Sequence, residues 1–114
     1  MFKHPNHLIG DVWFYAEKDR VHVYYLTCPD TLKPHTEWDI GHATSTDLIR
    51  WHVEEPALGR GPKGAWNDCY ATGNVVKAGS QYVMSFTSHN RAETGLARSK
   101  DLYHWELDSG NPTT

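Results

Sequence analysis

The sequence Gly-His-Ala-Thr-Ser-Thr-Asp-Leu-Ile-Arg-Trp, residues 41–51, returns in altered form as Gly-Leu-Ala-Arg-Ser-Lys-Asp-Leu-Tyr-His-Trp, residues 95–105. Six of the eleven positions are identical, and the two copies lie 54 residues apart. A fixed spacing of this size is typical of propellers and other repeat arrays. The repeat therefore predicts a repeated fold, of which 114 residues hold about two units.

The residues around each copy alternate between β-rich runs and turn signals, and no helical periodicity is present. The expected strands are 11–17, 21–27, 38–46 and 51–54 in the first unit, and 69–77, 81–87, 94–98 and 103–107 in the second. A connection with three glycines and two prolines, residues 56–64, separates them. Each unit is then a four-stranded antiparallel meander, the structure of a propeller blade. We predict an all-β fold with blade one at about 8–55 and blade two at about 66–108.

The repeated phrase Ser-x-Asp-Leu-x-x-Trp has a structural interpretation in both copies. We expect Asp47 and Asp101 to accept hydrogen bonds from backbone N–H groups of their turns. The leucine and tryptophan that follow each aspartate are expected to pack between blades. Because residues that repeat with a scaffold usually serve that scaffold, neither aspartate is expected to be catalytic.

Composition excludes several classes of function. The chain is 39% hydrophobic and 22% charged, which fits a soluble globular protein, and its net charge of −3 favours neither nucleic acid nor an anionic membrane as partner. The N-terminus has no apolar core of signal-peptide length, which leaves cytoplasmic and secreted locations open. Cys28 and Cys69 have no CxxC spacing and are expected to be ordinary thiols. The eight histidines have no paired spacing, so we expect no metal and no cofactor.

Four phrases, in order along the chain, resemble the five-bladed glycosidase propellers of glycoside hydrolase families 32 and 43 and their relatives. Gly-Asp-Val-Trp-Phe-Tyr at 10–15, followed by Val-His-Val-Tyr-Tyr-Leu at 21–26, resembles the family opening, in which an aspartate precedes a strand of the form fHvFYL. WDIGHATSTDLIRW at 38–51 is close to WGHAtStDLvhW, and WNDCYATGNVV at 66–76 is similar to the start of blade two. The fourth phrase is the second copy of the turn. Family 32 members usually carry Asn-Asp-Pro-Asn-Gly around the first aspartate, where this chain has Gly-Asp-Val-Trp.

The resemblance implies a role for Asp11. Glycoside hydrolysis normally uses two carboxyl groups that flank the scissile bond. Asp11 corresponds to the first, the nucleophile or base on the innermost strand of blade one; without the resemblance, it reads as a strand-start residue that caps a turn. The Arg-Asp-Pro and the later glutamate of these families are absent from the sequence. This chain by itself is therefore expected to be a poor glycosidase or none.

The resemblance also suggests residues that bind the sugar. Trp66 and Asp68 match positions lining the sugar site, where a tryptophan face stacks on a ring and a carboxylate accepts hydroxyl protons. Trp13 and His42 are further substrate-binding candidates. For Trp66 the alternative is packing between blades, and for His42 it is a buried structural histidine.

Two blades leave apolar faces and strand edges uncovered. We therefore expect either a homo-oligomer or completion of the ring by further blades. Three functions stay open: part of a hydrolase acting on a fructoside, arabinoside or xyloside; a non-catalytic carbohydrate-binding fragment; and a self-assembling scaffold. The expected partner is an oligo- or polysaccharide, with no nucleic acid and no membrane.

Overall fold

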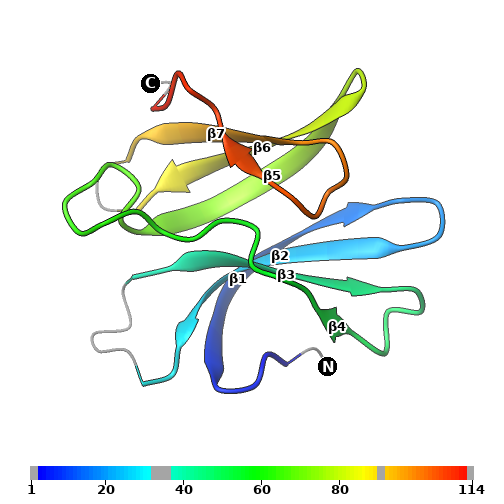
Figure 1. Ribbon diagram of the computed structural model, residues 1–114. Coiled ribbons are helices and arrows are strands. Elements are labelled where there is room, and N and C mark those ends of the chain that lie inside the picture. The colour runs from blue at the N-terminus through cyan, green and yellow to red at the C-terminus, as the bar shows by residue number, and fades with distance from the viewer. Residues whose placement is uncertain (1–2, 32–36, 90–91, 113–114) are drawn as a thin grey trace.

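The computed structural model of the chain describes residues 3–31, 37–89 and 92–112, which contain strands and turns but no helix (Figure 1). The first sheet has the order β1-β2-β3-β4 and consists of β1 (His7–Ala16), β2 (Val21–Pro29), β3 (Asp39–Ser45) and β4 (His52–Val53). The second sheet has the order β5-β6-β7-β8 and consists of β5 (Tyr70–Ala78), β6 (Gln81–Ser88), β7 (Thr94–Ser99) and β8 (Glu106–Leu107). All neighbouring strands are antiparallel. The predicted all-β fold of two consecutive meanders is confirmed.

Two strand boundaries differ from the expectation by more than two residues, each for an identifiable reason. β1 begins at His7 rather than at Asp11, because Leu8 pairs with Cys28 and the ladder continues across an irregularity in register. Asp11 thus lies inside a strand and does not cap its start. β8 begins at Glu106 rather than at residue 103, because the N–H groups of Tyr103 and His104 donate to the carboxylate of Asp101 instead of to a ladder.

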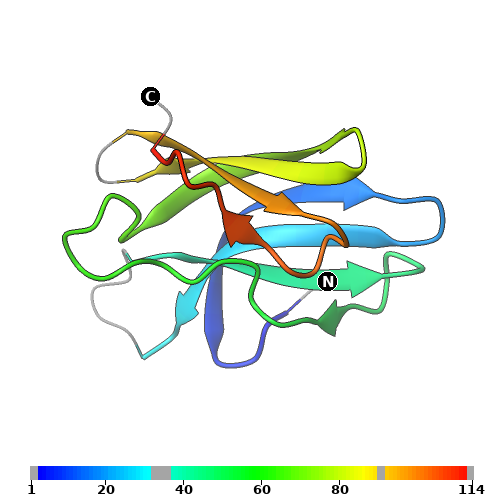
Figure 2. The ribbon, with the colours of Figure 1, turned by 45° about the horizontal axis from the view of Figure 1, so that its top comes forward.

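The two sheets form two twisted layers that are joined by the segment between β4 and β5 (Figure 2). Successive side chains along a strand point to opposite faces of its sheet, so every second side chain along a strand of the first sheet points toward the second sheet. The core between the layers buries one cluster of apolar side chains: Trp13, Tyr24, Leu26, Ile40, Ala57, Leu58, Tyr70, Val75, Met84, Phe86, Ala97, Leu102 and Trp105.

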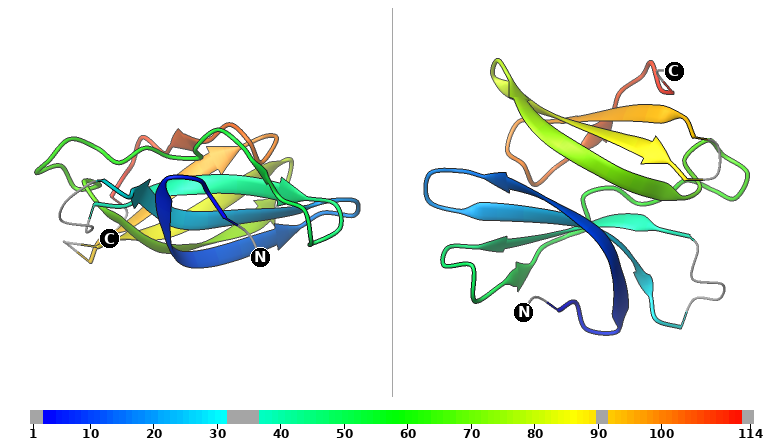
Figure 3. Two further views of the ribbon diagram at one scale, coloured as in Figure 1. Left: turned by 90° about the horizontal axis from the view of Figure 1, so that it is seen from below. Right: turned by 180° about the vertical axis from the view of Figure 1, so that it is seen from behind.

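β1 and β5 are the strands through which the two layers meet most closely (Figure 3). A Cβ atom at Gly73 on β5 would lie 2.6 Å from the carbonyl oxygen of Ser85 and 3.2 Å from the Trp13 ring. Glycine therefore allows the indole of Trp13 to pack against the β5 backbone. Farther from this contact, the Tyr24 hydroxyl donates to the carbonyl oxygen of Leu102 at 2.6 Å.

The two copies of the repeated turn have the same hydrogen bonds. Asp47 accepts from the N–H groups of residues 49 and 50, and Asp101 accepts from those of residues 103 and 104, as predicted. The leucine after each aspartate has a positive φ, 64° at Leu48 and 72° at Leu102.

Their packing is different. Leu102 is fully buried between the sheets, whereas Leu48 is 62% exposed. Trp105 belongs to the core between the sheets, and Trp51 packs on the opposite face of the first sheet with Val23 and Tyr25. The expectation that both copies pack between blades is confirmed for the second copy, whereas for the first copy it stays a prediction. No sheet of the described chain lies beside the first copy on that face.

Cys28 and Cys69 are buried, and burial raises the pKa of each thiol. Within the residues described, no helix is long and apolar enough to cross a membrane.

Candidate active site

Each of the two strands at the contact between the sheets carries a bulge. The pairing of β1 with β2 shifts register between Ile9 and Val12, and the pairing of β5 with β6 shifts between Tyr70 and Gly73. The residues outside the ladders are 10–11 in β1 and 71–72 in β5. Bulges re-aim side chains and are over-represented beside active sites. The resemblance implied an innermost strand for Asp11, and the structure places this residue in such a bulge.

The two bulges are joined by a hydrogen bond. The Thr72 hydroxyl donates to Oδ2 of Asp11. Both residues are exposed, so the contact lies at the surface of the junction rather than in the core. A carboxylate has about four acceptor positions on its two oxygens, and this bond uses one of them. Thr72 therefore fixes the orientation of Asp11 while leaving acceptor positions for another molecule.

Trp38 borders this junction. Its ring lies 3.7 Å from the position that a Cβ atom at Gly10 would occupy. Its backbone is tied to the second sheet, because its carbonyl oxygen accepts from the N–H of Tyr70 and its own N–H donates to Sγ of Cys69. The ring is partly buried against the core between the sheets.

Sequence reasoning missed both Thr72 and Trp38. Thr72 had a usable signal, since it is a polar residue in the middle of the strand expected to be innermost in blade two. Trp38 had none, because its ring reaches Gly10 from a segment 28 residues farther along the chain.

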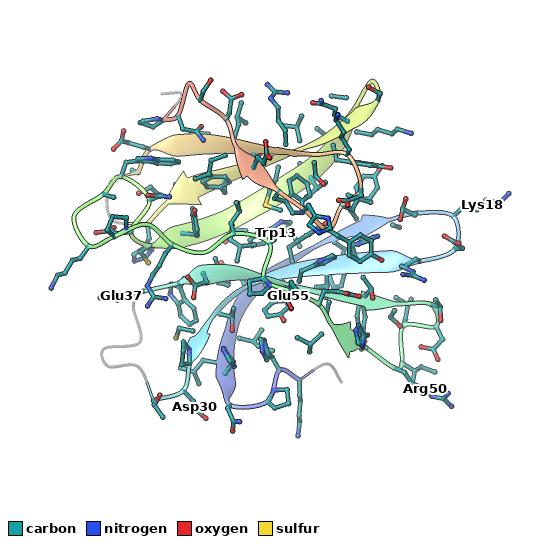
Figure 4. The ribbon with its side chains drawn as sticks, in the orientation of Figure 1. Trp13, Lys18, Asp30, Glu37, Arg50 and Glu55 are labelled. Atoms are coloured by element: carbon teal, nitrogen blue, oxygen red, sulfur yellow. The ribbon has the colours of Figure 1, made fainter. Side chains whose placement is uncertain are left out.

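Trp13, two residues beyond Asp11, points away from the exposed side of β1. It is 6% exposed and packs in the core between the sheets (Figure 4). Its Nε1–H is buried and has no hydrogen-bond partner among the described residues. The neighbours Val12 and Phe14 point to the opposite face and are 44% and 55% exposed.

Trp66 and Asp68 belong to the loop that enters the second sheet. The Trp66 ring stacks on Phe86, with ring centroids 6.0 Å apart, and its edge lies against Gly95. Oδ2 of Asp68 accepts a hydrogen bond from the N–H of Gly64 at 2.9 Å. Both residues are partly buried, so each has a contact within the loop or sheet and some surface left over.

His42 is fully buried between the sheets. Its ring stacks on Tyr24 at 4.6 Å, and its Nε2 lies 2.9 Å from Nδ1 of His22. Burial, reinforced by the neighbouring His22, lowers the pKa of His42 to about 3. His42 is therefore neutral near pH 7, and its described contacts are with core residues and Tyr103 rather than with Asp11.

The junction of the bulges thus offers one exposed, oriented carboxylate. In the described part of the chain, no hydrogen bond or ion pair joins Asp11 to a second carboxyl group. One carboxylate suffices for a nucleophile, a base or a hydrogen-bond acceptor, but not for the acid that protonates a leaving group. The described residues also contain no group of three or more His, Cys, Asp or Glu side chains arranged to hold a metal ion.

Comparison with known sequences identifies relatives. Residues 4–112 match the family described as the glycosyl hydrolases family 32 N-terminal domain. An insoluble β-fructofuranosidase isoenzyme of Arabidopsis thaliana is 32% identical over 68% of this chain and 14% of its own length. The sucrose-6-phosphate hydrolase of Escherichia coli is 31% identical over 85% of this chain and 22% of its own length. The chain therefore spans less than a quarter of either relative.

Comparison with solved structures supports the fold. A β-fructofuranosidase from Schwanniomyces occidentalis, complexed with fructosyl-erythritol, aligns with 99% of this chain at a TM-score of 0.82 and 20% identity, over 25% of its own length. Fructan 1-exohydrolase IIa from Cichorium intybus aligns with 97% of this chain at a TM-score of 0.79 and 22% identity, over 22% of its own length. Because nearly the whole chain superposes at once, the two sheets have the relative orientation of consecutive blades in these propellers.

Proposed function

The chain belongs to glycosyl hydrolase family 32, of which it carries the N-terminal domain sequence, and from this premise we propose that it forms the first two blades of a propeller that hydrolyses O-glycosidic bonds. The observation that carries the proposal is the junction of the two bulges, where the second sheet holds the exposed carboxylate of Asp11. In this proposal Asp11 is the nucleophile or base. The general acid is supplied from outside these 114 residues.

The chemistry of Asp11 follows from its surroundings. A nucleophilic or basic carboxylate must be accessible to a sugar and must hold its lone pairs toward it. Asp11 is exposed, and one of its oxygens is fixed by Thr72. Trp38, beside Gly10, offers a partly buried aromatic ring next to this carboxylate, and such rings stack on the C–H faces of sugars. We further propose that Trp66 and Asp68 contact the sugar with the surface that their own contacts leave uncovered. His42 and Trp13 then support the site from the core.

The number of blades decides how the ring is completed. The solved relatives are five-bladed, and this chain has two sheets in the orientation of consecutive blades. Two blades turn through two fifths of a circle, and no whole number of two-blade copies closes five fifths. Copies of this chain alone therefore cannot complete a ring with this geometry. We propose that three further blades complete it, so that of the two expectations raised by the sequence we favour further blades over a closed homo-oligomer.

The proposed substrate class is a fructoside, arabinoside or xyloside. Two relatives that are 31% and 32% identical to this chain have names that refer to a fructofuranosidase and to a hydrolase of sucrose 6-phosphate. However, the sequence around Asp11 is Gly-Asp-Val-Trp, and Trp13 is buried rather than presented to a ligand. Because the residues around Asp11 differ from the usual Asn-Asp-Pro-Asn-Gly motif, furanosides and pyranosides should be tested together.

The test measures hydrolysis of aryl fructosides, arabinosides and xylosides by the 114-residue chain and by the chain joined to the three blades of a family 32 relative. We expect turnover of at least one glycoside by the completed propeller, little or none by the two blades, and loss of turnover in Asp11→Asn. Glycan binding without turnover, unchanged in Asp11→Asn, would instead support a non-catalytic carbohydrate-binding propeller. A completed propeller that folds but neither binds nor cleaves any of these sugars would contradict the proposal and favour the scaffold.

A further inference from the structure

A cleft lies between the two sheets, and Asp11 is not among its lining residues. It has a volume of about 530 Å³, within the range of small-molecule sites. One wall is formed by His42 on β3 and by residues 54–57, the start of the connection in which Glu55 is labelled in Figure 4. The other wall is formed by the second copy of the repeated turn, with Asp101, Tyr103 and Trp105 among its lining residues.

A chain of hydrogen bonds determines which atom of His42 is available. Oε1 of Glu17 lies 2.9 Å from Nε2 of His22, and Nδ1 of His22 lies 2.9 Å from Nε2 of His42. A carboxylate only accepts, so His22 donates its Nε2–H to Glu17. When Nε2 carries the only ring proton of His22, its Nδ1 atom accepts, and His42 donates its Nε2–H to it. Neutral His42 is left with a bare lone pair on Nδ1.

That lone pair has no partner. Nδ1 of His42 is buried and makes no hydrogen bond with any described residue. A buried polar atom without a partner destabilises the fold, and a hydrogen-bond donor would relieve this cost. Because His42 lines the cleft, the missing donor can come from a molecule bound there.

The charge of the lining selects the kind of donor. Four carboxylates line the cleft, those of Glu54, Glu55, Asp101 and Glu106. Asp101 is paired with His104 at 2.6 Å, and Glu54 accepts from the Thr44 hydroxyl, whereas no ion pair to Glu55 or Glu106 is present in the described residues. The aromatic rings of Tyr103 and Trp105 also line the cleft, and such rings attract cations. Acceptors, negative charge and aromatic rings together favour a cationic donor over a neutral one.

We propose that this cleft binds a small organic cation with a primary ammonium group, which donates toward Nδ1 of His42 and is held by the carboxylates of Glu55 and Glu106. Its alkyl part packs against the aromatic wall. The site is independent of the proposed hydrolytic function, because it shares no described contact with Asp11 or Thr72.

The test uses the 114-residue chain labelled with ¹⁵N in its histidine rings. Cadaverine is titrated at pH 8 while the His42 Nδ1 resonance is followed by NMR, and sorbitol serves as the neutral donor. We expect a saturable shift of Nδ1 toward the value of a hydrogen-bonded nitrogen with cadaverine and none with sorbitol. Glu55→Gln and Glu106→Gln should each weaken binding by about two- to fivefold, as expected for an exposed charge pair. Glu93→Gln, which removes one charge in the connection between β6 and β7, should leave the affinity unchanged.

Three results would overturn the proposal. The first is the absence of any saturable change of Nδ1 with cadaverine. The second is an equal response to sorbitol, which would identify a polyol site instead. The third is equal binding by Glu55→Gln, Glu106→Gln and Glu93→Gln, which would mean that the carboxylates of the cleft do not hold the cation. None of these variants changes a buried residue, so a folding defect does not obscure the result.

Discussion

The two copies of Ser-x-Asp-Leu-x-x-Trp have one backbone conformation and two environments. In both, a serine and an aspartate accept the N–H groups of the turn, and the leucine has a positive φ. In the second copy the leucine is fully buried, and in the first it is 62% exposed. This difference shows that the repeated residues encode the local turn, whereas the neighbouring sheet determines what the turn contributes to stability.

The second copy is the one that meets a neighbour. The carbonyl oxygen of Leu102 accepts from the Tyr24 hydroxyl of the first sheet, and the Tyr103 hydroxyl accepts from the Arg20 guanidinium at 2.7 Å. The first copy has its exposed leucine on the face where a further blade would lie in a closed ring. The comparison therefore makes predictions about the present chain and about the completed propeller.

The largest effect is expected from truncation of the two leucines. Leu102→Ala removes a fully buried side chain and should lower the free energy of unfolding by about 2–5 kcal/mol. Leu48→Ala changes an exposed side chain and should stay within about 0.5 kcal/mol. Urea unfolding of the two variants measures both values. Equal losses would contradict the conclusion that the neighbouring sheet determines what each turn contributes to stability.

Acid should weaken the contact between the sheets, because His42 packs against Tyr103 of the second copy. The pKa of His42 is lowered by burial to about 3, below the 6.5 of an unfolded histidine. Between these values the unfolded chain binds a proton that the folded chain does not, so stability is complete above pH 6.5 and falls as the pH drops toward 3. The expected slope is up to about 1.4 kcal/mol per pH unit.

Unfolding by urea at pH 7 and pH 5 checks this slope. His42→Phe, which keeps an aromatic ring on Tyr24, should reduce the acid loss, whereas His52→Gln, at a 79% exposed side chain, should leave it unchanged. An unaltered slope in His42→Phe would assign the acid loss to other groups.

The aspartates of the two turns should differ by a smaller amount. Desolvation raises the pKa of Asp101. Hydrogen bonds from the backbone and ring of His104, and from Tyr103 and Ser99, outweigh this effect and hold the pKa well below its usual range. Asp47 has its pKa lowered by the N–H groups of Arg50 and Ile49. Asp101→Ala should cost about 1–2 kcal/mol, comparable to the loss of a helix N-cap, and Asp47→Ala should cost less.

The smallest expected effect concerns Thr72, which joins the two bulges. Thr72→Val keeps the shape of the side chain and removes its hydroxyl, so Asp11 loses its orienting bond. In the completed propeller we expect kcat/KM to fall about tenfold, through kcat rather than KM, because a misplaced reacting group slows the chemical step. Thr72→Ser restores the donor and should restore kcat; failure of the serine variant to do so would make Thr72 a packing residue only.

The sequence was sufficient to predict the architecture and one of the two residues that join the bulges, Asp11. The repeat of residues 41–51 and the alternation of β-rich runs predicted two four-stranded meanders, and the resemblance selected Asp11. The exposure of Leu48 in the described chain was not anticipated, because a repeated sequence does not show that only one of two identical turns has a neighbouring sheet there. Thr72 and Trp38 were missed, because their approach to Asp11 and Gly10 depends on bulges and on the relative orientation of two sheets.

The most direct test of the central claim compares two aspartates of the same chain in the completed propeller. Asp11 lies in the bulge of β1 at the contact between the sheets, and Asp47 lies in a repeated turn. We predict that Asp11→Asn lowers kcat/KM for the preferred aryl glycoside by at least about a thousandfold without changing the fold, as expected when a nucleophile or base is removed. Asp47→Asn should leave kcat/KM within about twofold of the parent. Equal activity of the two variants would contradict the account.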